Sequence, residues 1–321
     1  MTDRILITGG LGYLGGRVSK YLSETTDYEL RITTRKNPND CPVWLKNGEI
    51  IKLDFVSDND FSLLCEGVKC VIHLAAMNEI DCASDPVSAL AVNGLGSLKF
   101  LNAALKAGVK RFIYFSTAHI YGSPLQGIIN EKSCPRPVHP YAISHRTAED
   151  FVLSAHDKKA IVGIVLRLSN GLGCPVSSDI NRWTLLVNDL CRQAATTGKL
   201  ILKSSGIQKR DFIALTDVCR AVSHLLTLPA ERCLDGLFNL GGECSMSINE
   251  MAGLIADRCN KVLGFMPEIV MLKTKDNNIS MPLEYSIDKI KSTGFELNRN
   301  IIEEIDSELK FCKDKFCANL L

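Results

Sequence analysis

Three glycines near the amino terminus have a spacing that can bind phosphate. Gly9, Gly12 and Gly15 follow the apolar run of residues 5–7, and residues 13–22 carry apolar side chains at helical intervals. In such a turn the first glycine lets the chain reverse, the second lets the backbone approach a pyrophosphate, and the third lets the helix pack close to the sheet. The free N–H groups at the start of the helix would face the bound anion. A strand, a glycine turn and a helix in this order predict a dinucleotide site.

Apolar runs typical of strands alternate with helical stretches over the first half of the chain. This alternation predicts a parallel sheet with helices on both faces, an α/β fold with a Rossmann-type doubly wound sheet. The strand-like runs are residues 5–8, 30–34, 50–53, 70–74, 112–115 and 161–166, and the longest helices are expected over residues 87–106 and 141–155.

Beyond residue 167 the pattern becomes irregular and predicts a smaller, interleaved α/β region that binds the substrate. A helix is expected around residues 182–195, a strand at 200–203, and helices near 248–259 and 301–312. Residues 212–213 and a helix over 217–228 are expected to return to the main sheet. We therefore assign residues 1–168, with about 210–240, to a dinucleotide-binding domain, and about 169–209 and 241–321 to the substrate-binding region.

The composition limits the possible partners and the location. The 321 residues are 46% hydrophobic, enough for a large core, and 37 basic residues nearly balance 36 acidic ones. This balance provides no overall field that would attract nucleic acid or an anionic membrane, and no apolar run approaches the ~20 residues that span a bilayer. The 13 cysteines are scattered singly, and the chain begins with a core strand where a secreted protein has its signal peptide, so we expect a cytoplasmic protein without a metal site.

A set of ordered motifs resembles the extended short-chain dehydrogenase/reductases of the nucleotide-sugar epimerase/dehydratase group. The resemblance extends over most of the chain, and its matching segments are TGGLGYLG at 8–15, LD at 53–54, HLAA at 73–76, VN at 92–93, FSTAHIYG at 115–122, YAIS at 141–144, LRLSN at 166–170, RDFI at 210–213 and FNLG at 238–241. The resemblance implies an NAD(P)(H)-dependent oxidoreductase that moves a hydride at a ring carbon of a nucleotide-diphosphate sugar, by 4-keto reduction or 4-hydroxyl oxidation. A nucleotide-sugar 4-epimerase is the alternative. The resemblance also implies a homodimer formed through the two long helices of the first domain.

The resemblance identifies Tyr141 as the general acid/base and Thr117 as the residue that orients the reacting sugar oxygen. In the family a lysine four residues after the tyrosine stabilises its phenolate, and here that position is His145. Because imidazole has a reference pKa of ~6.5, His145 would be mostly uncharged at neutral pH. Three interpretations stay open: a working site with a shifted pH optimum, a tyrosine that mainly donates a hydrogen bond, or a catalytically weak protein that binds dinucleotide or nucleotide-sugar.

The choice of cofactor is made at the end of the second strand. A carboxylate there accepts both ribose hydroxyls of NAD, whereas an arginine suits the additional phosphate of NADP. This strand is followed by Arg35 and Lys36 without an acid, which favours NADP(H). The other expected cofactor contacts, besides the three glycines, are Tyr13, Leu14, Asp54, Phe55, Leu74, Ala75, Ala76, Asn93, Tyr141 and His145.

The pyrophosphate of a nucleotide sugar requires cationic or amide donors. Arg210 is the candidate for this pyrophosphate, and Asn170 is expected to donate to it or to the sugar. Asn181 and Arg182 are expected to open a helix and contact the nucleotide. Dehydratases of the family typically place Asp-Glu after the threonine, whereas this chain has Ala118-His119. This difference disfavours 4,6-dehydration and favours simple redox chemistry or redox-linked epimerisation.

Overall fold

The computed structural model describes residues 3–35, 41–58, 60–271 and 281–317. Its main sheet has seven strands in the order β11-β7-β5-β4-β1-β2-β3, and every neighbouring pair is parallel. The strands are β1 (Arg4–Thr8), β2 (Glu29–Thr34), β3 (Gly48–Lys52), β4 (Val68–His73), β5 (Arg111–Thr117), β7 (Val162–Leu168) and β11 (Leu237–Leu240). The strand order reverses between β1 and β4, where doubly wound sheets bind their ligands. The predicted fold class is confirmed.

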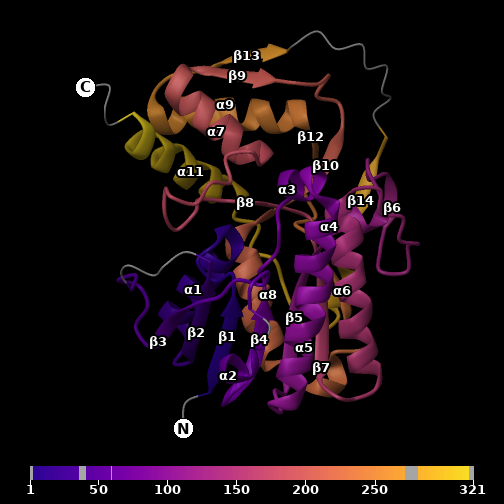
Figure 1. Cartoon of the computed structure of the whole chain (residues 1–321). Coiled ribbons are helices and arrows are strands. Elements are labelled where there is room, and N and C mark those ends of the chain that lie inside the picture. The colour runs from indigo at the N-terminus through magenta and orange to yellow at the C-terminus, as the bar shows by residue number, and fades with distance from the viewer. Residues whose placement is uncertain (1–2, 36–40, 59, 272–280, 318–321) are drawn as a thin grey trace.

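Helices cover both faces of the sheet because its strands carry apolar side chains on both sides (Figure 1). In β1, Ile5 and Ile7 face the core under α1 (Tyr13–Thr25) and α8 (Leu215–Thr227). Leu6 points to the opposite core, which contains residues of α5 (Ser97–Lys106) and α6 (Pro140–Asp157). The expected helix over 87–106 is formed by α4 (Pro86–Ala89), a π-helical stretch (Leu90–Gly96) and α5 in direct succession. The remaining short helices of this part are α2 (Ser62–Cys65) and α3 (Glu79–Ser84).

A second part of the protein, at the top of Figure 1, encloses a core of its own. It contains α7 (Leu186–Thr197), α9 (Ile248–Leu263), α11 (Ile301–Phe316) and the parallel pair β9 (Lys199–Leu202) and β13 (Glu268–Met271). The other elements are β6 (Gly127–Ile129), β8 (Asn170–Leu172), β10 (Lys209–Ala214), β12 (Ser245–Ser247), β14 (Leu283–Tyr285) and α10 (Asp288–Lys291). Within the described ranges, no helix combines the length and the apolar character that a membrane crossing requires.

Two expectations about the second half are wrong. The strand at 212–213 does not join the main sheet, because β10 pairs with β8 and β12 in a separate three-stranded sheet. Its side chains alternate between the two cores: Phe212 packs in the second and Ile213 in the first. The strand that returns beside β7 is β11, whereas the helix expected over 217–228 does return to the main sheet, as α8, which packs beside α1.

The helix expected around 182–195 begins only at Leu186, so the residues before it lie in a loop. In this loop Trp183 is buried against the rings of Phe311 and Phe316, with centroids 6.2 and 5.0 Å away. The packing of this ring on α11 accounts for the late start of the helix. The domain limits assigned above remain predictions.

Candidate active site

The glycine turn after β1 forms a cradle that fits a pyrophosphate. Gly9 has a φ of +64°, which favours glycine, and a Cβ at Gly15 would lie only 2.2 Å from the carbonyl oxygen of Gly9. Gly12 precedes α1, and no side chain caps this helix. Among the described residues no side chain occupies the first N–H groups of α1, and their binding of an anion beside β1 stays a prediction.

The side chain of Tyr13 connects this turn to the second part of the protein. Its hydroxyl is buried and donates to the carbonyl oxygen of Gly173 at 2.7 Å, with Oδ1 of Asn188 at 3.1 Å. Only the backbone of Tyr13 is therefore available to a cofactor. Leu14 is half-buried and packs against the main core.

The residues after β4 form the neighbouring wall of the cradle. A Cβ at Gly9 would lie 3.0 Å from the Cα of Ala75, so the two segments are in close contact. The backbone N–H groups of Leu74 and Ala75 donate to the hydroxyl of Thr8, at 3.1 and 3.2 Å. Ala76 is exposed. Both side chains are small, and their contact with a cofactor remains a prediction.

Three of the expected cofactor contacts, Arg35, Asp54 and Phe55, follow the strands β2 and β3. Arg35 is exposed just after β2, and Lys36 lies outside the described residues. The carboxylate of Asp54 accepts from the backbone N–H of Val56 at 2.9 Å. The ring of Phe55 packs inward, 5.2 to 5.7 Å from the rings of three buried residues, Phe61, His73 and Phe100. A contact between Phe55 and the adenine would therefore come from its backbone.

Tyr141 stands in the first turn of α6, directly over His145. The helix starts with Pro140 and is capped by His139, whose Nδ1 accepts from the backbone N–H of Tyr141 at 3.2 Å. The next turn brings His145 under the phenol ring, with ring centroids 4.4 Å apart and the planes at 64°. This edge-to-face contact fixes the direction of the phenol.

His145 is turned into the core, where it meets Tyr114 of β5. Its Nδ1 and the hydroxyl of Tyr114 are 2.8 Å apart, and Nε2 is buried without a well-formed hydrogen bond to any described residue. Burial lowers the pKa of His145 to about 4, with slight opposition from the backbone of Phe115. The histidine is therefore neutral at pH 7 and does not replace the charge of the family lysine.

Tyr141 itself is held in the protonated form. Burial raises the pKa of its phenol well above the usual value of 10.0, the negative charge of Glu79 raises it further, and the charge of Arg182 opposes both. At neutral pH the group can donate a proton but can accept one only after it has given its own away.

A buried row of neutral polar groups continues behind His145. The ring of His73 lies 5.8 Å from that of Tyr114, and its nitrogens contact the hydroxyls of Thr8 at 2.7 Å and Ser97 at 2.9 Å. Burial lowers the pKa of His73 to about 3. Sequence reasoning missed Tyr114, although its position in β5, which alternates toward α6, is a signal that could have found it.

Thr117 is the last residue of β5, at the carboxyl end of the sheet. It is buried, and its Oγ1 accepts from the backbone N–H of His119 at 3.2 Å. The proton of this hydroxyl is not used in that bond, so it can be donated to a ligand. Ser116 has a buried hydroxyl without a partner among the described residues.

Arg210 is a cation with no described partner. Its neighbour Asp211 is occupied, because the carboxylate accepts from the backbone N–H groups of Gly242 and Cys244, each at 2.9 Å. Burial lowers the pKa of Arg210. Desolvation and then the charge of Arg210 lower the pKa of His119, although part of this histidine is exposed. A half-buried, unpaired guanidinium is suited to bind an anion.

The two expected amide contacts differ in their surroundings. Asn170 opens β8, and its amide donates to the carbonyl oxygen of Asp211 at 2.9 Å, so one of its two N–H donors is used within the protein. Asn181 is exposed in the loop before α7. The expectation that Asn181 and Arg182 open a helix is wrong, and their roles toward a nucleotide remain predictions.

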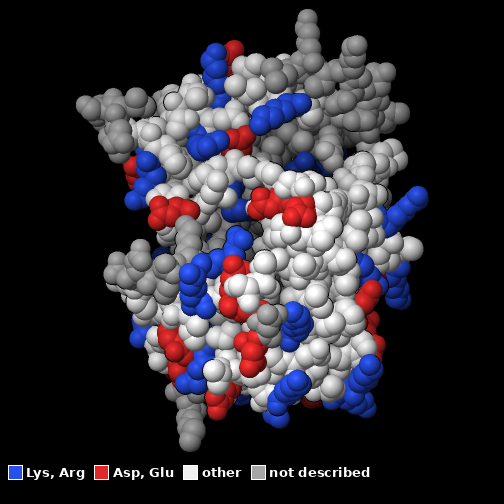
Figure 2. All heavy atoms as spheres, in the orientation of Figure 1, with Lys and Arg blue, Asp and Glu red and all other residues white. Residues whose placement is uncertain are grey.

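Glu79, which no sequence motif singled out, forms an ion pair with Arg182 across 3.0 Å. Glu79 begins α3, and in Figure 1 this helix lies where the two parts of the protein meet. Figure 2 shows charged side chains of both signs around the hollow between these parts. In the described ranges, no group of three His, Cys, Asp or Glu side chains has the arrangement of a metal site.

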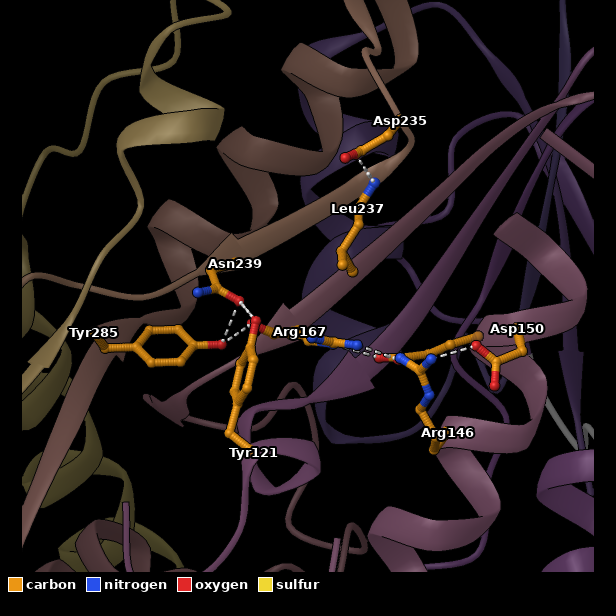
Figure 3. A network of polar contacts seen from close by, with 9 residues as sticks. Tyr121, Arg146, Asp150, Arg167, Asp235, Leu237, Asn239 and Tyr285 are labelled. Atoms are coloured by element: carbon orange, nitrogen blue, oxygen red, sulfur yellow. Dashed lines mark hydrogen bonds and ion pairs between the residues drawn. The ribbon is translucent and has the colours of Figure 1, made fainter. Parts of the chain in front are cut away.

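After the first turn of α6, which carries Tyr141, a buried charge network holds this helix in place (Figure 3). Glu149 accepts two hydrogen bonds from Arg167 of β7, at 2.9 and 2.8 Å, and both side chains are buried. Arg146 binds the same carboxylate at 3.1 Å and Asp150 at 2.6 Å, so it is engaged away from Tyr141.

On its other side Arg167 lies over the ring of Tyr121, 4.7 Å from its centroid. The hydroxyls of Tyr121 and Tyr285 donate to Oδ1 of Asn239, at 2.7 and 3.1 Å (Figure 3). The network thus links α6 to β7, β11 and β14, and it holds the helix that carries Tyr141.

Comparison with known proteins agrees with this geometry. Residues 5–241 match the model of the NAD dependent epimerase/dehydratase family. The dTDP-D-glucose 4,6-dehydratase of Mus musculus is 30% identical over 265 residues, which span 78% of this chain and 71% of the relative. MoeE5 in complex with UDP-glucose and NAD has a TM-score of 0.80 and 21% identity, and the match covers 97% of this chain and 99% of that one.

A second solved structure has the same fold over nearly its whole length. The UDP-N-acetylglucosamine 4-epimerase from Methanobrevibacter ruminantium M1, in complex with UDP-N-acetylmuramic acid, has a TM-score of 0.80 and 23% identity, covering 98% of this chain and 100% of that one. The family model spans well over half of the chain and includes the glycine cradle and the turn of Tyr141. As its motifs predicted, this chain belongs to the NAD dependent epimerase/dehydratase family.

Proposed function

We propose that the protein reduces a keto group on the ring of a nucleotide-diphosphate sugar. The family resemblance implies C4 as the position of this group. The observation that carries this proposal is the edge-to-face contact of Tyr141 with the buried His145. At this place burial raises the pKa of the phenol and lowers that of the imidazole, which favours a protonated Tyr141 beside a neutral His145. In this reaction a hydride adds to the carbonyl carbon, and the carbonyl oxygen takes the proton of Tyr141. The sugar becomes an alcohol, with the hydride that a bound nicotinamide would supply, and the phenolate that remains takes a new proton from water. The reverse reaction, 4-hydroxyl oxidation, would begin with the phenolate and is therefore favoured only at high pH.

The glycine cradle fits the dinucleotide that this reaction requires. Gly9, Gly12 and Gly15 leave the space, and the uncapped start of α1 offers N–H groups to the pyrophosphate. The dinucleotide supplies the hydride when bound. We propose NADP(H) as the preferred form, because the exposed Arg35 follows β2 and suits a 2′-phosphate.

We propose that the substrate lies between Thr117, Tyr141 and Arg210. Thr117 would donate to the reacting sugar oxygen, and Arg210 would bind the pyrophosphate, supported by its lack of a described partner. MoeE5, which shares the fold, holds UDP-glucose. The mouse relative is named as a 4,6-dehydratase, but Ala118 and His119 provide no carboxylic acid after Thr117, which supports redox chemistry without elimination.

Two other functions make different demands on the cofactor. A 4-epimerase must retain its dinucleotide and return the hydride, and the fold of the solved 4-epimerase supports this alternative. A catalytically weak binding protein would bind dinucleotide or nucleotide sugar without turnover, which the neutral His145 supports. The retained pair of Thr117 and Tyr141 favours an enzyme, because a binding protein gains little from a proton donor at this place.

The first test is to denature the purified protein and identify any released dinucleotide by mass. UDP- and dTDP-linked 4-keto sugars are then offered with NADPH or NADH, and the oxidation of the cofactor is followed. We expect an empty site, turnover with NADPH, and a loss of kcat of roughly a hundredfold or more in Tyr141→Phe. Tyr28→Phe, at the opposite end of the sheet, is the matched control. Stoichiometric retained NAD with interconversion of sugar nucleotides would instead support the epimerase, and binding without turnover the third alternative.

We also propose a homodimer that forms through α4, the π-helical stretch and α6. Large apolar side chains are exposed along these helices, at Val87, Leu90, Leu95, Ile143 and Phe151. Burying such a surface would stabilise association. Light scattering after gel filtration should give twice the mass of the chain, and Phe151→Glu should shift the protein to monomers. A monomeric wild-type protein would contradict this proposal.

A cytoplasmic location is proposed from the state of the cysteines. All 13 are free thiols in the structure, and most are buried. Reduced thiols are typical of the cytoplasm. Fractionation of cells that produce the tagged protein tests this proposal.

A further inference from the structure

The ion pair between Glu79 and Arg182 joins the two parts of the protein at the active site. Glu79 begins α3, which follows β4, whereas Arg182 lies in the loop between β8 and α7 (Figure 1). The charged groups are 3.0 Å apart, and the side chains are 36% and 24% exposed. The pair is therefore accessible to water and can open without leaving an unpaired charge in the core.

A chain of hydrogen bonds holds the start of α3 against the turn that carries Tyr141. Oδ1 of Asn93 accepts from the backbone N–H of Met77 at 2.7 Å, and the amide of Asn93 donates to Oγ of Ser144 at 3.0 Å. Oγ of Ser144 in turn donates to the carbonyl oxygen of Tyr141 at 2.9 Å. Because α3 also packs against α6, Glu79 and the guanidinium that it holds lie close to the part of α6 that carries Tyr141.

Both members of the pair act on the phenol of Tyr141, in opposite directions. The carboxylate of Glu79 favours the protonated phenol and raises its pKa, after the larger effect of burial. The guanidinium of Arg182 favours the phenolate and lowers the pKa. While the pair is closed, the two effects oppose each other, and that of Glu79 is the larger.

Besides His139, whose Nδ1 accepts from the backbone N–H of Tyr141, the titratable groups around the phenol are His145 on the same helix, Tyr114 on β5 and Cys82 on α3. Burial keeps His145 neutral, with a pKa of about 4, and the other two side chains are uncharged or negative. Among the described residues, Arg182 is therefore the cation that can stabilise the phenolate of Tyr141.

We propose that Arg182 takes the place of the missing lysine, and that Glu79 controls how much of its charge reaches Tyr141. The proposal rests on the proposed function, in which Tyr141 gives its proton to the sugar oxygen and is left as a phenolate. With the ion pair closed, the phenol stays protonated and ready to donate. When Glu79 releases Arg182, the guanidinium stabilises the phenolate until water returns the proton. Because Arg182 belongs to the second part of the protein, this stabilisation depends on how the two parts meet.

The direct test measures the ionisation of residue 141 without substrate. The protein is produced with 3,5-difluorotyrosine at position 141, whose phenol is more acidic than that of tyrosine, and its titration is followed by fluorine NMR. We expect Arg182→Gln to raise the pKa of this phenol by about one pH unit and Glu79→Gln to lower it by a similar amount. Arg192→Gln, which removes a cation paired with Asp189 on α7, is the matched control and should leave the pKa unchanged.

An unchanged or lowered pKa in Arg182→Gln would overturn the proposal. So would an equal effect of Arg192→Gln, because the response would then report only the net charge of the protein. Arg182→Lys keeps a cation at this place, so it should restore most of the wild-type pKa, and failure to do so would contradict a role through charge.

A kinetic test separates this role from simple binding of the substrate. In the protein with 3,5-difluorotyrosine at position 141, Arg182→Gln should move the alkaline limb of the pH profile of kcat for keto-sugar reduction up by about one pH unit. His145→Lys should return that limb in the Arg182→Gln background, because the lysine again supplies a cation one turn from Tyr141. An increase in KM that His145→Lys leaves unchanged, with no shift of the kcat profile, would assign Arg182 to substrate binding and overturn the inference. If no keto sugar is reduced at all, the proposed function fails, whereas the fluorine titration still decides the role of Arg182.

Discussion

The hydroxyl of Tyr114 lies 2.8 Å from Nδ1 of His145, and both groups are buried beneath Tyr141. The residue at the position of the family lysine thus takes part in a neutral network of the core. A lysine side chain could extend past the core toward a ligand, but the shorter imidazole is held by Tyr114 and is neutralised by burial. The chemistry of the site therefore depends on charges from elements other than α6.

Gly15→Ala should weaken dinucleotide binding and destabilise the protein. The new Cβ would lie 2.2 Å from the carbonyl oxygen of Gly9, and relief of this clash moves the turn away from α1. We expect a cost of about 1–3 kcal/mol in the free energy of unfolding. Gly253→Ala is the control, because a Cβ there meets nothing within 4 Å, and in α9 it should stabilise the protein by about 0.5–1 kcal/mol. Fluorescence titration with NADPH and urea unfolding measure both effects, and unimpaired binding in Gly15→Ala would refute the proposed cradle.

Arg35→Ser should reduce the preference for NADPH over NADH. A charged hydrogen bond to the 2′-phosphate contributes about 1.5–3 kcal/mol, so the Kd for NADPH should rise roughly tenfold or more while that for NADH changes little. Lys20→Ser, on the exposed side of α1, controls for the loss of one positive charge. Calorimetric titration of each variant with both dinucleotides gives the Kd values. Equal affinities of the wild-type protein for NADH and NADPH would show that Arg35 does not select the cofactor.

Glu308 should make the stability of the protein depend on pH. Both its carboxylate oxygens are buried without a partner among the described residues. Burial, and then the negative charge of Glu304, raise its pKa from 4.5 to about 8. The folded state therefore keeps a proton that the unfolded state loses.

The sign follows from these two values. The contribution of Glu308 is fully present below pH 4.5 and is lost as the pH rises toward about 8, by about 1.4 kcal/mol per pH unit for one proton. Glu308→Gln does not titrate, so the stability of the variant relative to the wild-type protein should increase between about pH 5 and about pH 8. This range lies between the pKa values of Glu308 in the unfolded and the folded protein. Urea unfolding over this range measures it. A difference that stays constant with pH would mean that Glu308 ionises normally in the folded protein.

Arg167→Met should be strongly destabilising because it leaves the carboxylate of Glu149 buried with only Arg146 beside it. Breaking such a buried pair costs about 3–5 kcal/mol. Arg4→Met breaks the pair with Glu29, which is partly exposed, and should cost no more than about 1 kcal/mol. The double variant Glu149→Leu/Arg167→Met should recover part of the lost stability. Urea unfolding of the four proteins gives these values, and equal losses for the two arginines would contradict the assigned network.

Much of the fold could be predicted because local sequence patterns determine it. The central strands β1, β4 and β5 are short, mostly apolar runs that are buried on both faces, and each run alone predicts the place of its strand within a few residues. The strand β10 could not be placed in this way. Its alternation of Phe212 and Ile213 fits either sheet, and only the presence of two cores on its two sides decides which strands it joins.

The sequence by itself determined the glycine cradle and the spacing of Tyr141 and His145. Both depend on a few consecutive residues: a clash-free turn requires glycine, and one helical turn brings residue 145 under residue 141. Only the tertiary structure decided the charges at the site. The burial of His145 against Tyr114, and the pairing of Glu79 with Arg182, join residues 31 and 103 positions apart. Protonation in a folded protein depends on solvent exclusion and on distances between such residues, and no local pattern records either.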